Sequence, residues 1–373
     1  MNTEENVKSK VQQRIIDNLP NVAHGLLALA PRVGKTKIAI DKLKLEECES
    51  ILWVTPSSEL RDKDIPEEFV RWWSKDALKR LKCVTYTYLP KIEGTFDKVI
   101  LDEYQDVTEL NTEPLFNGNI KYKSILGLSG TPPEHEEKID IYKKLKLKTL
   151  YELSIDEAVE LKILADYEIT VVNCHTNHTT KDVHIKTKKH DFKTTERKQY
   201  ESADSGIRRM MFSGKGVPTF MFLNRMRLIH NSKTKLNAAK RLIKSLVGST
   251  LVFCSNIAQS EELSKNLYNS KTNKDALEKF KRGRLKTLAC VNSGGVGFTF
   301  KNVNNFVIVQ ANSNKKGDIT QKIARSLLHQ GNDYKANIYI INLVDTQDNE
   351  WVNKVLTTFN TDKVKYISNL NLK

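Results

Sequence analysis

Long apolar runs are absent from this sequence of 373 residues. No apolar stretch approaches the roughly 20 residues that a helix needs to cross a bilayer. The first ten residues, MNTEENVKSK, carry charges of both signs and lack the apolar core of a secretory signal. These absences predict a protein that is neither embedded in a membrane nor secreted, and we expect it in the cytoplasm.

Cysteine is scarce, and its spacing forms no pairs. The chain has five cysteines, an odd number, and no two of them stand in a C-x-x-C arrangement. This pattern argues against a disulfide framework and is typical of a reducing compartment.

Acidic residues are in deficit. Asp and Glu total 45 against 60 Lys and Arg, which gives a formal net charge of +15. A polyanionic partner, such as a nucleic acid, is therefore the first partner to consider. The excess is spread along the chain in patches such as KFKRGRLK, and each patch taken alone fits a solvated helical face equally well.

Short apolar runs are abundant, and they alternate with longer mixed segments. GLLALA, SILWVTP, KCVTYTYL, DKVILDE and YKSILGLSG occur in the first half, and STLVFCS, KTLACVN, NNFVIVQ and NIYIINLVD in the second. Runs of this length, separated by stretches that can be helical, predict buried parallel strands with crossover helices. We therefore expect an α/β protein with two mainly parallel sheets in series, each flanked by helices, which also suits the length of the chain.

The boundary between the two predicted domains lies near residue 165. We expect residues 1–165 to form the first domain and residues 166–373 to form a linker and the second domain. The connecting stretch contains one candidate insertion, residues 176–215, and no separate accessory domain is evident. It also contains FLNRMRLIHNSKTK, which predicts an amphipathic helix with a basic outer face.

The segment LLALAPRVGKTKIAI, residues 26–40, predicts a strand, a tight turn and a helix. Such a turn aims backbone N–H groups and the positive end of the helix dipole at one point, which binds phosphate. Gly34 allows close approach of the backbone, Lys35 reaches the terminal phosphates, and the Thr36 hydroxyl suits Mg²⁺. The glycine that normally opens this pattern is missing, because Leu29 occupies its position.

Two carboxylates follow the apolar run DKVIL. Asp102 and Glu103 fall at the C-terminal end of this predicted strand, where parallel α/β sheets place their chemistry. Asp102 would hold Mg²⁺, and Glu103 would orient and deprotonate an attacking water. For this segment alone, an acidic strand end followed by a turn is the simpler interpretation, so the assignment depends on the rest of the chain.

Taken together and in order, these stretches resemble the motor core of superfamily-2 helicases, including its phage-like and Swi/Snf-related branches. The matching segments are VQQRII (the adenine-reading glutamine, Gln12 or Gln13), ILWVTPSSELRD (motif Ia), DEYQ (the DExx box), LGLSGTP (motif III), TLVFCSN (motif IV), VNSGGVGFTF (motif V) and QKIARSLLHQ (motif VI). Each segment is weak alone, but the complete set extends across almost the whole chain.

The resemblance implies two tandem RecA-like domains that close on ATP and Mg²⁺. The nucleotide would be bound by Gln13, Arg32, Gly34, Lys35, Thr36 and Gly297, the metal by Thr36 and Asp102, and catalysis would use Lys35, Asp102, Glu103, Gln321 and Arg325. Arg325 takes the place of the arginine finger, which stabilises charge on the γ-phosphoryl group. Gln321 would contact that group or the attacking water.

The resemblance also implies a path for a nucleic-acid strand. Its polar residues at strand ends suit phosphate oxygens and read no sequence; they are Pro56, Ser57, Ser255, Asn256, Asn292 and Ser293. Taken alone, these residues also fit ordinary turn chemistry. Gln105, Ser129 and Thr131 would couple the nucleotide site to this path.

The function predicted from the sequence is a nucleic-acid-dependent ATPase that translocates on, unwinds or remodels DNA. One departure keeps an alternative open, because Leu328 stands where motif VI of the family carries a second arginine. The alternative is a nucleic-acid-binding or annealing clamp with little or no ATP hydrolysis. We expect DNA rather than RNA as the partner, a monomer that works with replication or recombination proteins, and, from the Lys-, Asn- and Ile-rich composition, a viral source.

Overall fold

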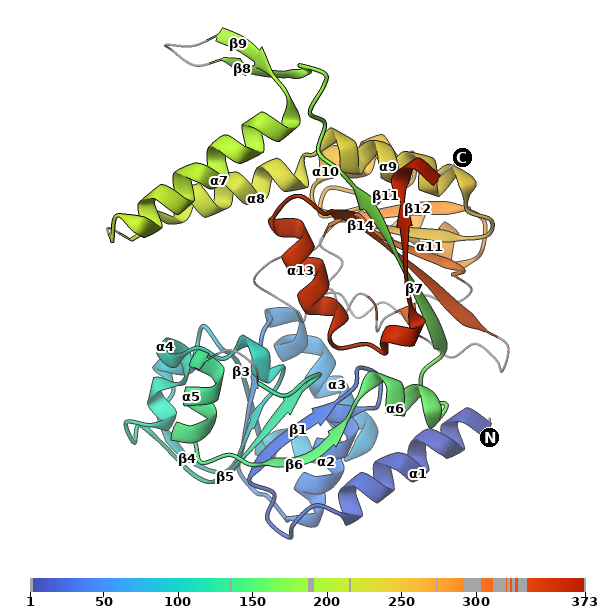
Figure 1. Cartoon of the computed structure of the whole chain (residues 1–373). Helices are drawn as coiled ribbons and strands as arrows, with labels where there is room; N and C mark the ends of the chain where they lie inside the picture. The colour runs from blue at the N-terminus through green and yellow to red at the C-terminus, as the bar shows by residue number, and fades with distance from the viewer. Residues whose placement is uncertain are drawn as a thin grey trace. The chain divides into compact units, whose positions relative to one another are not determined.

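The computed structural model describes residues 3–133, 136–186, 191–214, 216–272, 274–291, 303–310, 320, 323, 326–327 and 334–371. The chain divides into two compact units, Met1–Leu164 and Ala165–Lys373. Each unit is built around one parallel sheet with helices beside it (Figure 1).

The sheet of the first unit has six parallel strands in the order β3-β2-β4-β5-β1-β6. They are β1 (Gly25–Leu29), β2 (Ile51–Thr55), β3 (Leu81–Thr85), β4 (Gly94–Leu101), β5 (Ile120–Ser129) and β6 (Thr149–Leu153). The helices are α1 (Thr3–Asp17), α2 (Lys35–Leu45), α3 (Ile65–Trp72), α4 (Glu109–Thr112), α5 (Glu136–Lys144) and α6 (Ile155–Glu160). Helix α2 contacts both α1 and α3, and α4 contacts α5. Strands β1 and β2 are buried at every residue, as expected for strands covered on both faces.

The sheet of the second unit has seven parallel strands in the order β11-β12-β10-β13-β14-β7-β15. They are β7 (Asp166–Cys174), β10 (Thr250–Cys254), β11 (Leu267–Tyr268), β12 (Thr287–Val291), β13 (Asn305–Ile308), β14 (Lys335–Leu343) and β15 (Val364–Ser368). Its helices include α9 (Lys233–Ser245), α10 (Ile257–Leu263), α11 (Asp275–Lys281) and α13 (Gln347–Leu356). The core of this unit packs α9 against the sheet through residues such as Ala238, Leu242 and Val252.

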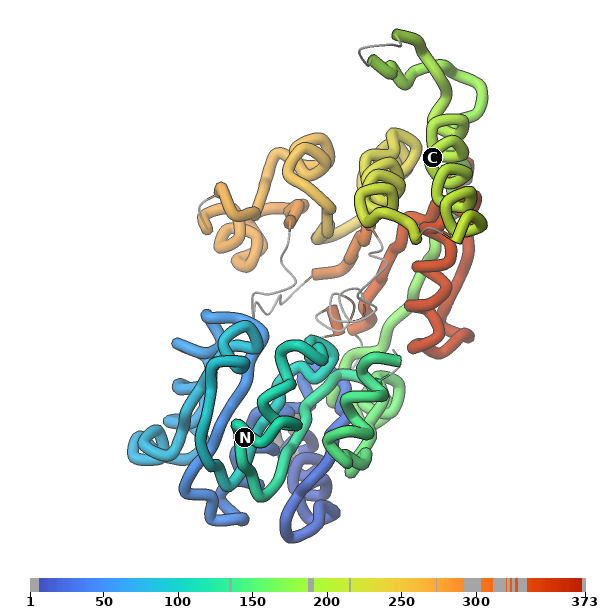
Figure 2. The backbone as a smooth tube through the Cα atoms, turned by 90° about the vertical axis from the view of Figure 1, so that its left-hand side faces the viewer, coloured from blue at the N-terminus to red at the C-terminus, as the bar shows by residue number. Residues whose placement is uncertain are grey.

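An insertion stands between β7 and α9. It begins with an antiparallel ribbon of β8 (Val183–Lys186) and β9 (Asp191–Thr194), and continues as a helical hairpin of α7 (Glu196–Phe212) and α8 (Thr219–His230). The ribbon lies at the outer end of this unit in both views (Figures 1 and 2). The hairpin points away from the sheet in Figure 1 and toward the viewer in Figure 2.

The predicted fold class is confirmed, and each of the nine apolar runs contains a strand. Two details differ from the expectations. Strand β7, within the stretch interpreted as a connection, is an interior strand of the second sheet, paired with both β14 and β15. The predicted amphipathic helix is two helices, because α8 ends at His230 and Ser232 caps α9 by accepting a hydrogen bond from the Lys235 N–H.

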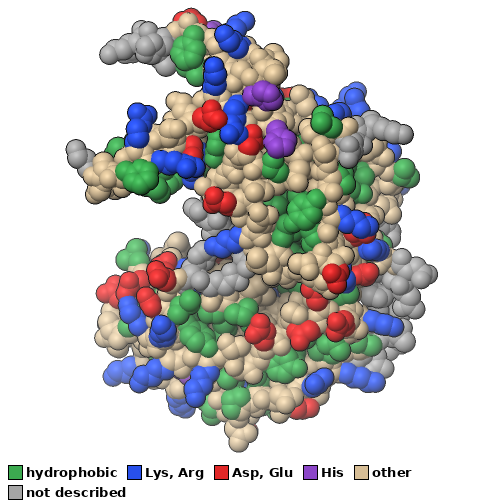
Figure 3. All heavy atoms as spheres, in the orientation of Figure 1, with side chains coloured by type: hydrophobic (Ala, Val, Ile, Leu, Met, Phe, Trp, Pro, Cys, Tyr) green, Lys and Arg blue, Asp and Glu red, His purple; other side chains and the backbone are tan. Residues whose placement is uncertain are grey.

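The surface follows the charge pattern of the sequence. Lys and Arg side chains are scattered over the visible faces of both units and not gathered in one block (Figure 3). No helix in the described parts of the chain is long and apolar enough to cross a membrane.

Candidate active site

The carboxyl ends of β1, β4 and β5 bring three predicted segments to one edge of the first sheet. The phosphate loop, residues 30–34, follows β1, and Asp102 and Glu103 follow β4. Ser129 is the last residue of β5, and Thr131 comes shortly after it. Because the strands are parallel, these ends share an edge of the sheet.

The phosphate loop makes its turn without the missing glycine. Leu29 is fully buried as the last residue of β1, so its position belongs to the strand and not to the turn. The turn falls at Arg32 and Gly34, whose φ values of 69° and 100° lie in the left-handed region. Helix α2 begins directly afterwards at Lys35. The first N–H groups of α2 lack helical partners, so they are available to bind an anion at this turn.

A buried glutamine of α1 supports the loop from behind. The Gln12 side-chain amide donates a 2.7 Å hydrogen bond to the carbonyl of Val33. A Cβ at position 34 would lie 2.3 Å from the Gln12 nitrogen, so the contact requires glycine there. Gln13, the residue that we selected for adenine, is exposed, and its amide donates to Asp17. Of the two candidates, Gln12 is the one that contacts the phosphate loop.

Asp102 is a buried carboxylate with few partners. One of its oxygens accepts a 3.0 Å bond from the Glu103 N–H, and its carbonyl accepts a 2.8 Å bond from the Tyr86 hydroxyl. Burial raises the pKa of Asp102 to about 7, the negative charge of Glu103 acts in the same direction, and the Lys35 ammonium opposes both. A nearby cation would therefore stabilise the charged form.

The donor set at this edge fits Mg²⁺. Asp102 offers a carboxylate and Thr36 a hydroxyl, and hard oxygen ligands are those that Mg²⁺ prefers. Within the described residues, no group of three His, Cys, Asp or Glu is placed to hold a metal ion by itself. One carboxylate and one hydroxyl suit Mg²⁺, because this ion is usually completed by water and substrate phosphates.

A chain of hydrogen bonds links the two acidic residues to the end of β5. Glu103 has a φ of 48°, an uncommon value for a non-glycine residue. The Gln105 amide donates a 2.6 Å bond to the Glu103 carboxylate. The Ser129 hydroxyl donates to the Gln105 oxygen at 3.1 Å and accepts from the Thr131 N–H at 3.3 Å. The three residues predicted to couple the site thus lie in one network with Glu103.

Comparison with known proteins gives a structural likeness only. No protein-family model and no curated protein matches the sequence. The fold is similar to S. cerevisiae Dbp5 bound to RNA and ADP BeF3, with a TM-score of 0.56, 13% identity and coverage of 96% of this chain and 90% of Dbp5. It is similar to the Pyrococcus furiosus Hef helicase domain, with a TM-score of 0.57, 12% identity and coverage of 93% and 97%.

The ATP-dependent Type ISP restriction-modification enzyme LlaBIII bound to DNA is also similar, with a TM-score of 0.58 and 13% identity. That match covers 97% of this chain but 31% of LlaBIII. The chain therefore has two RecA-like domains in tandem, a fold that it shares with Dbp5 and with the Hef helicase domain. The fold expected from the short motifs agrees with this likeness, which extends over almost the whole chain.

The predicted nucleic-acid contacts in the described residues lie at strand ends and have local hydrogen-bond partners. Ser57 follows β2, and its hydroxyl accepts a 3.3 Å bond from the Leu60 N–H; Pro56 beside it is exposed. Asn256 caps α10 by accepting from the Gln259 N–H at 2.8 Å, and the Ser255 hydroxyl donates to the Gln259 side chain. These bonds are turn and cap chemistry, and a role toward nucleic acid stays a prediction.

Several predicted residues lie outside the described residues. They are Asn292, Ser293, Gly297, Gln321 and Arg325, together with Leu328. Motif V and most of motif VI therefore stay predictions from the sequence.

Two residues near the site were not predicted. Tyr86, at the end of β3, holds the Asp102 carbonyl, and no motif marks it. Lys8 lies one turn before Gln12 on α1, and its Cε would be 3.5 Å from a Cβ at Gly34. Burial lowers the pKa of Lys8, and the like charge of Arg32 acts in the same direction. Residues four positions apart on a helix lie on the same face. The position of Lys8 near the loop could therefore be inferred only after Gln12 was known to face the loop.

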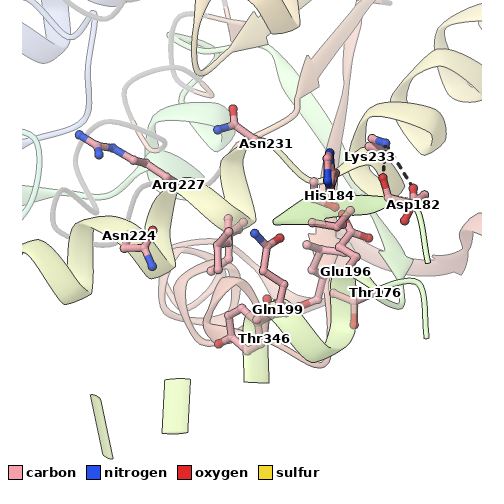
Figure 4. Close-up of a pocket in the computed structure, with 16 residues that line it drawn as sticks. Thr176, Asp182, His184, Glu196, Gln199, Asn224, Arg227, Asn231, Lys233 and Thr346 are labelled. Atoms are coloured by element: carbon pink, nitrogen blue, oxygen red, sulfur yellow. Dashed lines mark hydrogen bonds and ion pairs between the residues drawn. The ribbon is translucent and has the colours of Figure 1, made fainter. Parts of the chain in front are cut away.

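A cavity of about 450 Å³ lies in the second unit at the base of the insertion (Figure 4). The Gln199 side chain points into the space between Asn231 and Thr346. Lys233 pairs with Asp182 at 3.5 Å in its wall, and the Glu196 carboxylate accepts bonds from Asn177 and Thr234. None of the predicted site residues that the structure describes lines this cavity. Asp182 and Glu196 in the cavity wall thus link the insertion to the start of α9, through Lys233 and Thr234.

Proposed function

We propose that this protein is a nucleic-acid-dependent ATPase of the superfamily-2 helicase class, which couples ATP hydrolysis to translocation on, unwinding or remodelling of DNA. The observation that carries the proposal is the edge of the first sheet. There the left-handed turn before Lys35, the buried Asp102 and the network through Glu103 follow neighbouring parallel strands. Phosphoryl transfer depends mainly on positioning and on charge stabilisation, and these groups supply both.

The residues divide the work by their chemistry. Lys35 and the N–H groups at the start of α2 bind the terminal phosphates. Thr36 and Asp102 hold Mg²⁺, which neutralises charge on the phosphate oxygens when it is bound. Glu103 orients a water and accepts its proton as the oxygen attacks the γ-phosphorus and the bond to the β–γ bridging oxygen breaks.

Gln105, Ser129 and Thr131 are proposed to report the state of the nucleotide. A change in the position of the Glu103 carboxylate alters its bond to Gln105, and Gln105 in turn bonds Ser129. This network joins the turn after β4 to the turn after β5. Both turns belong to the edge at which the predicted contacts of motif Ia also lie.

The second unit is proposed to supply the remaining groups. Gln321 and Arg325 would act on the γ-phosphoryl group, and Gly297 would contact the nucleotide. Pro56, Ser57, Ser255, Asn256, Asn292 and Ser293 would bind the phosphates of the track without reading its sequence. Of the similar structures, Dbp5 is bound to RNA and LlaBIII is bound to DNA. We propose DNA as the track and a monomer that works beside replication or recombination proteins in the cytoplasm.

The test is steady-state ATP hydrolysis without nucleic acid and with single-stranded DNA, duplex DNA or RNA. Lys35→Ala and Glu103→Gln are each expected to lower kcat by at least about 100-fold, because each removes a group that acts in the transition state. Lys44→Ala is the matched control, since Lys44 lies in the same helix and pairs with Asp41 away from the loop. It is expected to keep activity within about twofold of the parent.

The outcomes separate the two hypotheses. Stimulation by one nucleic acid that both site variants lose supports the motor and names its track. If the parent protein does not hydrolyse ATP but binds nucleic acid tightly and in a salt-sensitive way, the ATPase proposal is wrong. The alternative of a nucleic-acid-binding clamp with little or no ATP hydrolysis is then supported. Full activity of Lys35→Ala contradicts the assignment of the site.

A further inference from the structure

The methionines of this protein are gathered in one place. The chain has five, and apart from Met1 all of them lie in the helical hairpin, at Met210, Met211, Met221 and Met226. Methionine is flexible and polarizable, and it is common on surfaces that adapt to a partner. The hairpin tip, defined here as residues 208–214 and 216–223, is therefore unusual in composition.

The tip exposes large apolar side chains. Phe212 at the end of α7 is 91% exposed and Phe220 at the start of α8 is 69% exposed, while Met211 and Leu223 are also exposed. Figure 3 shows hydrophobic side chains at the free end of the hairpin, with Lys or Arg side chains beside them. Contiguous exposed apolar groups on a folded protein mark an interaction site.

Only positive charge accompanies these side chains. From Ser205 to Arg227 the sequence contains four arginines and one lysine but no Asp or Glu. Arg208 and Arg225 pair with Asp204, at 2.8 and 2.5 Å, just before this segment. Arg209 and Arg227 are exposed. The partner of the tip is therefore expected to combine apolar surface with negative charge.

The hairpin projects from the second unit, so its free end is convex (Figure 3). Helices α7 and α8 contact each other along the hairpin, where a Cβ at Gly206 would lie 3.2 Å from the Met221 side chain. A peptide helix docks into a groove, whereas a convex end with Phe, Met and Arg is the type of surface that inserts beside bases and contacts phosphates. A second copy of the same tip would bring like charges together, which disfavours self-association through this surface.

We propose that the hairpin tip binds the exposed base pair of a nucleic-acid duplex at its junction with single strands. Phe212 and Phe220 stack on or between bases there. Arg209 of the tip contacts the adjacent phosphates, and Arg227, further along α8 in the wall of the cavity of Figure 4, contacts phosphates farther from the junction. The inference rests on the proposed function for its choice of nucleic acid. It assigns to the insertion a role in separating or unstacking bases.

The experiment uses the full chain and a forked DNA duplex that carries 2-aminopurine at the junction, without nucleotide. Base unstacking raises the fluorescence of 2-aminopurine, and fluorescence anisotropy gives the affinity for the fork and for single-stranded DNA. The test variant is the double substitution Phe212→Ser/Phe220→Ser, whose positions are exposed and outside the core. Tyr366→Ser is the matched control, because Tyr366 is an aromatic that is 58% exposed on β15.

The double variant is expected to lose the fluorescence rise and at least about fivefold of its affinity for the fork, with single-strand affinity changed by less than about twofold. Tyr366→Ser is expected to behave as the parent. An unchanged fluorescence rise in the double variant overturns the proposal. So does a parent protein that sediments as a dimer and becomes a monomer in the double variant, because the tip then binds a second copy.

The proposed function can fail separately. Lys35→Ala should keep the fluorescence rise at the fork, because that readout needs no hydrolysis. If the parent shows the rise but no ATP turnover, the motor is wrong and the tip assignment stands. If the parent hydrolyses ATP with DNA but shows no rise, the tip assignment is wrong and the motor stands.

Discussion

The residues of the predicted phosphate loop explain how its turn forms although the sequence motif is incomplete. The first glycine of the usual pattern corresponds to Leu29, which is buried at the end of β1. Arg32 and Gly34 then provide the left-handed conformations of the turn. Conformational freedom is needed at these two positions and not at position 29, so leucine is compatible with the loop.

The pair Gln12 and Gln13 offers the sharpest test at this scale. Gln12→Ala leaves the Val33 carbonyl without its side-chain donor, and an unsatisfied buried group costs about 1–3 kcal/mol. We expect weaker nucleotide binding and a lower midpoint of urea unfolding. Isothermal titration calorimetry with a non-hydrolysable ATP analogue measures the first effect, and tryptophan fluorescence in urea measures the second.

Gln13→Ala is the matched control, because it makes the same change one residue later on the same helix. Gln13 is exposed and bonds Asp17, so its loss is expected to change stability by less than about 0.5 kcal/mol. A larger loss of nucleotide affinity in Gln13→Ala than in Gln12→Ala would return the adenine contact to Gln13.

Sequence reasoning could not choose between these glutamines, for a physical reason. Adjacent residues on a helix point about 100° apart, and the face that turns toward the loop is set by the packing of α1 on α2. By contrast, Lys35, Asp102 and Glu103 could be located in advance, because a strand end in a parallel sheet fixes the edge on which its next residues lie. Tyr86 acts through its distant contact with the Asp102 carbonyl, and no local pattern encodes that contact.

At the scale of the elements, the strands that coincide with continuous apolar runs were predictable, whereas strand β7, whose sequence mixes apolar and polar residues, was not. Strand β10 is apolar and buried at every residue. Strand β7 alternates buried and partly exposed residues and includes Asp166, Glu168 and Asn173, so it resembles a polar connection. Its identity comes from a nine-residue register with β14, more than 160 positions later in the chain. Pairing at that separation leaves no local signal.

The root of the insertion is fastened to the second sheet by one carboxylate. Asp345, two residues after the end of β14, accepts bonds from the Thr176 N–H and hydroxyl and from Arg197 of α7 at 2.5 Å. Burial raises the pKa of Asp345, but the bonds from Thr176 and the pairing with Arg197 outweigh it and hold the pKa below its usual value. Asp345 therefore joins β7, α7 and β14 in its charged form.

This arrangement predicts a pH-dependent contribution to stability. Because the pKa of Asp345 is lower in the folded state, the carboxylate stabilises the fold at pH values above its unfolded pKa of about 3.9. That contribution is lost as the pH falls through the lower folded pKa. Asp345→Asn is expected to lower the free energy of unfolding by about 1–3 kcal/mol at pH 7. The difference from the parent should be constant between pH 7 and 5 and narrow below about pH 4.

Urea unfolding at pH 7, 5 and 3.5 measures this difference. Asp362→Asn is the control, since Asp362 is an exposed aspartate of the same unit, and it is expected to match the parent within about 0.5 kcal/mol. The free energy of unfolding of Asp345→Asn could instead differ from that of the parent by the same amount at all three pH values. That result would show that the bonds from Thr176 and Arg197 do not depend on the charge of Asp345.

For the molecule as a whole, the net charge is the property that bears on the proposed nucleic-acid partner. The chain carries a formal net charge of +15, which favours a polyanion. Lys and Arg side chains are scattered over the face shown in Figure 3, while the predicted strand-end contacts are few. Affinity for nucleic acid should therefore arise mostly from phosphate contacts, with little selection among sequences.

Salt dependence tests this expectation directly. Each phosphate that the protein neutralises releases counterions, so affinity falls steeply as salt concentration rises, and six to ten contacts correspond to a loss of about 10³- to 10⁵-fold between 50 and 200 mM salt. We expect at least about a tenfold loss over this range for single-stranded DNA, with similar affinities for oligonucleotides of unrelated sequence. Fluorescence anisotropy at four salt concentrations gives the slope of the logarithm of affinity against the logarithm of salt concentration.

A double variant, Arg209→Ala/Arg227→Ala, should lower this slope for a fork by about two contacts. Lys44→Ala should leave the slope unchanged, because Lys44 pairs with Asp41 in a helix of the first unit. An affinity that is independent of salt, or that differs more than about 100-fold between two sequences, would mean that base contacts and not phosphates dominate, and the track residues at the strand ends would then have to be reassigned.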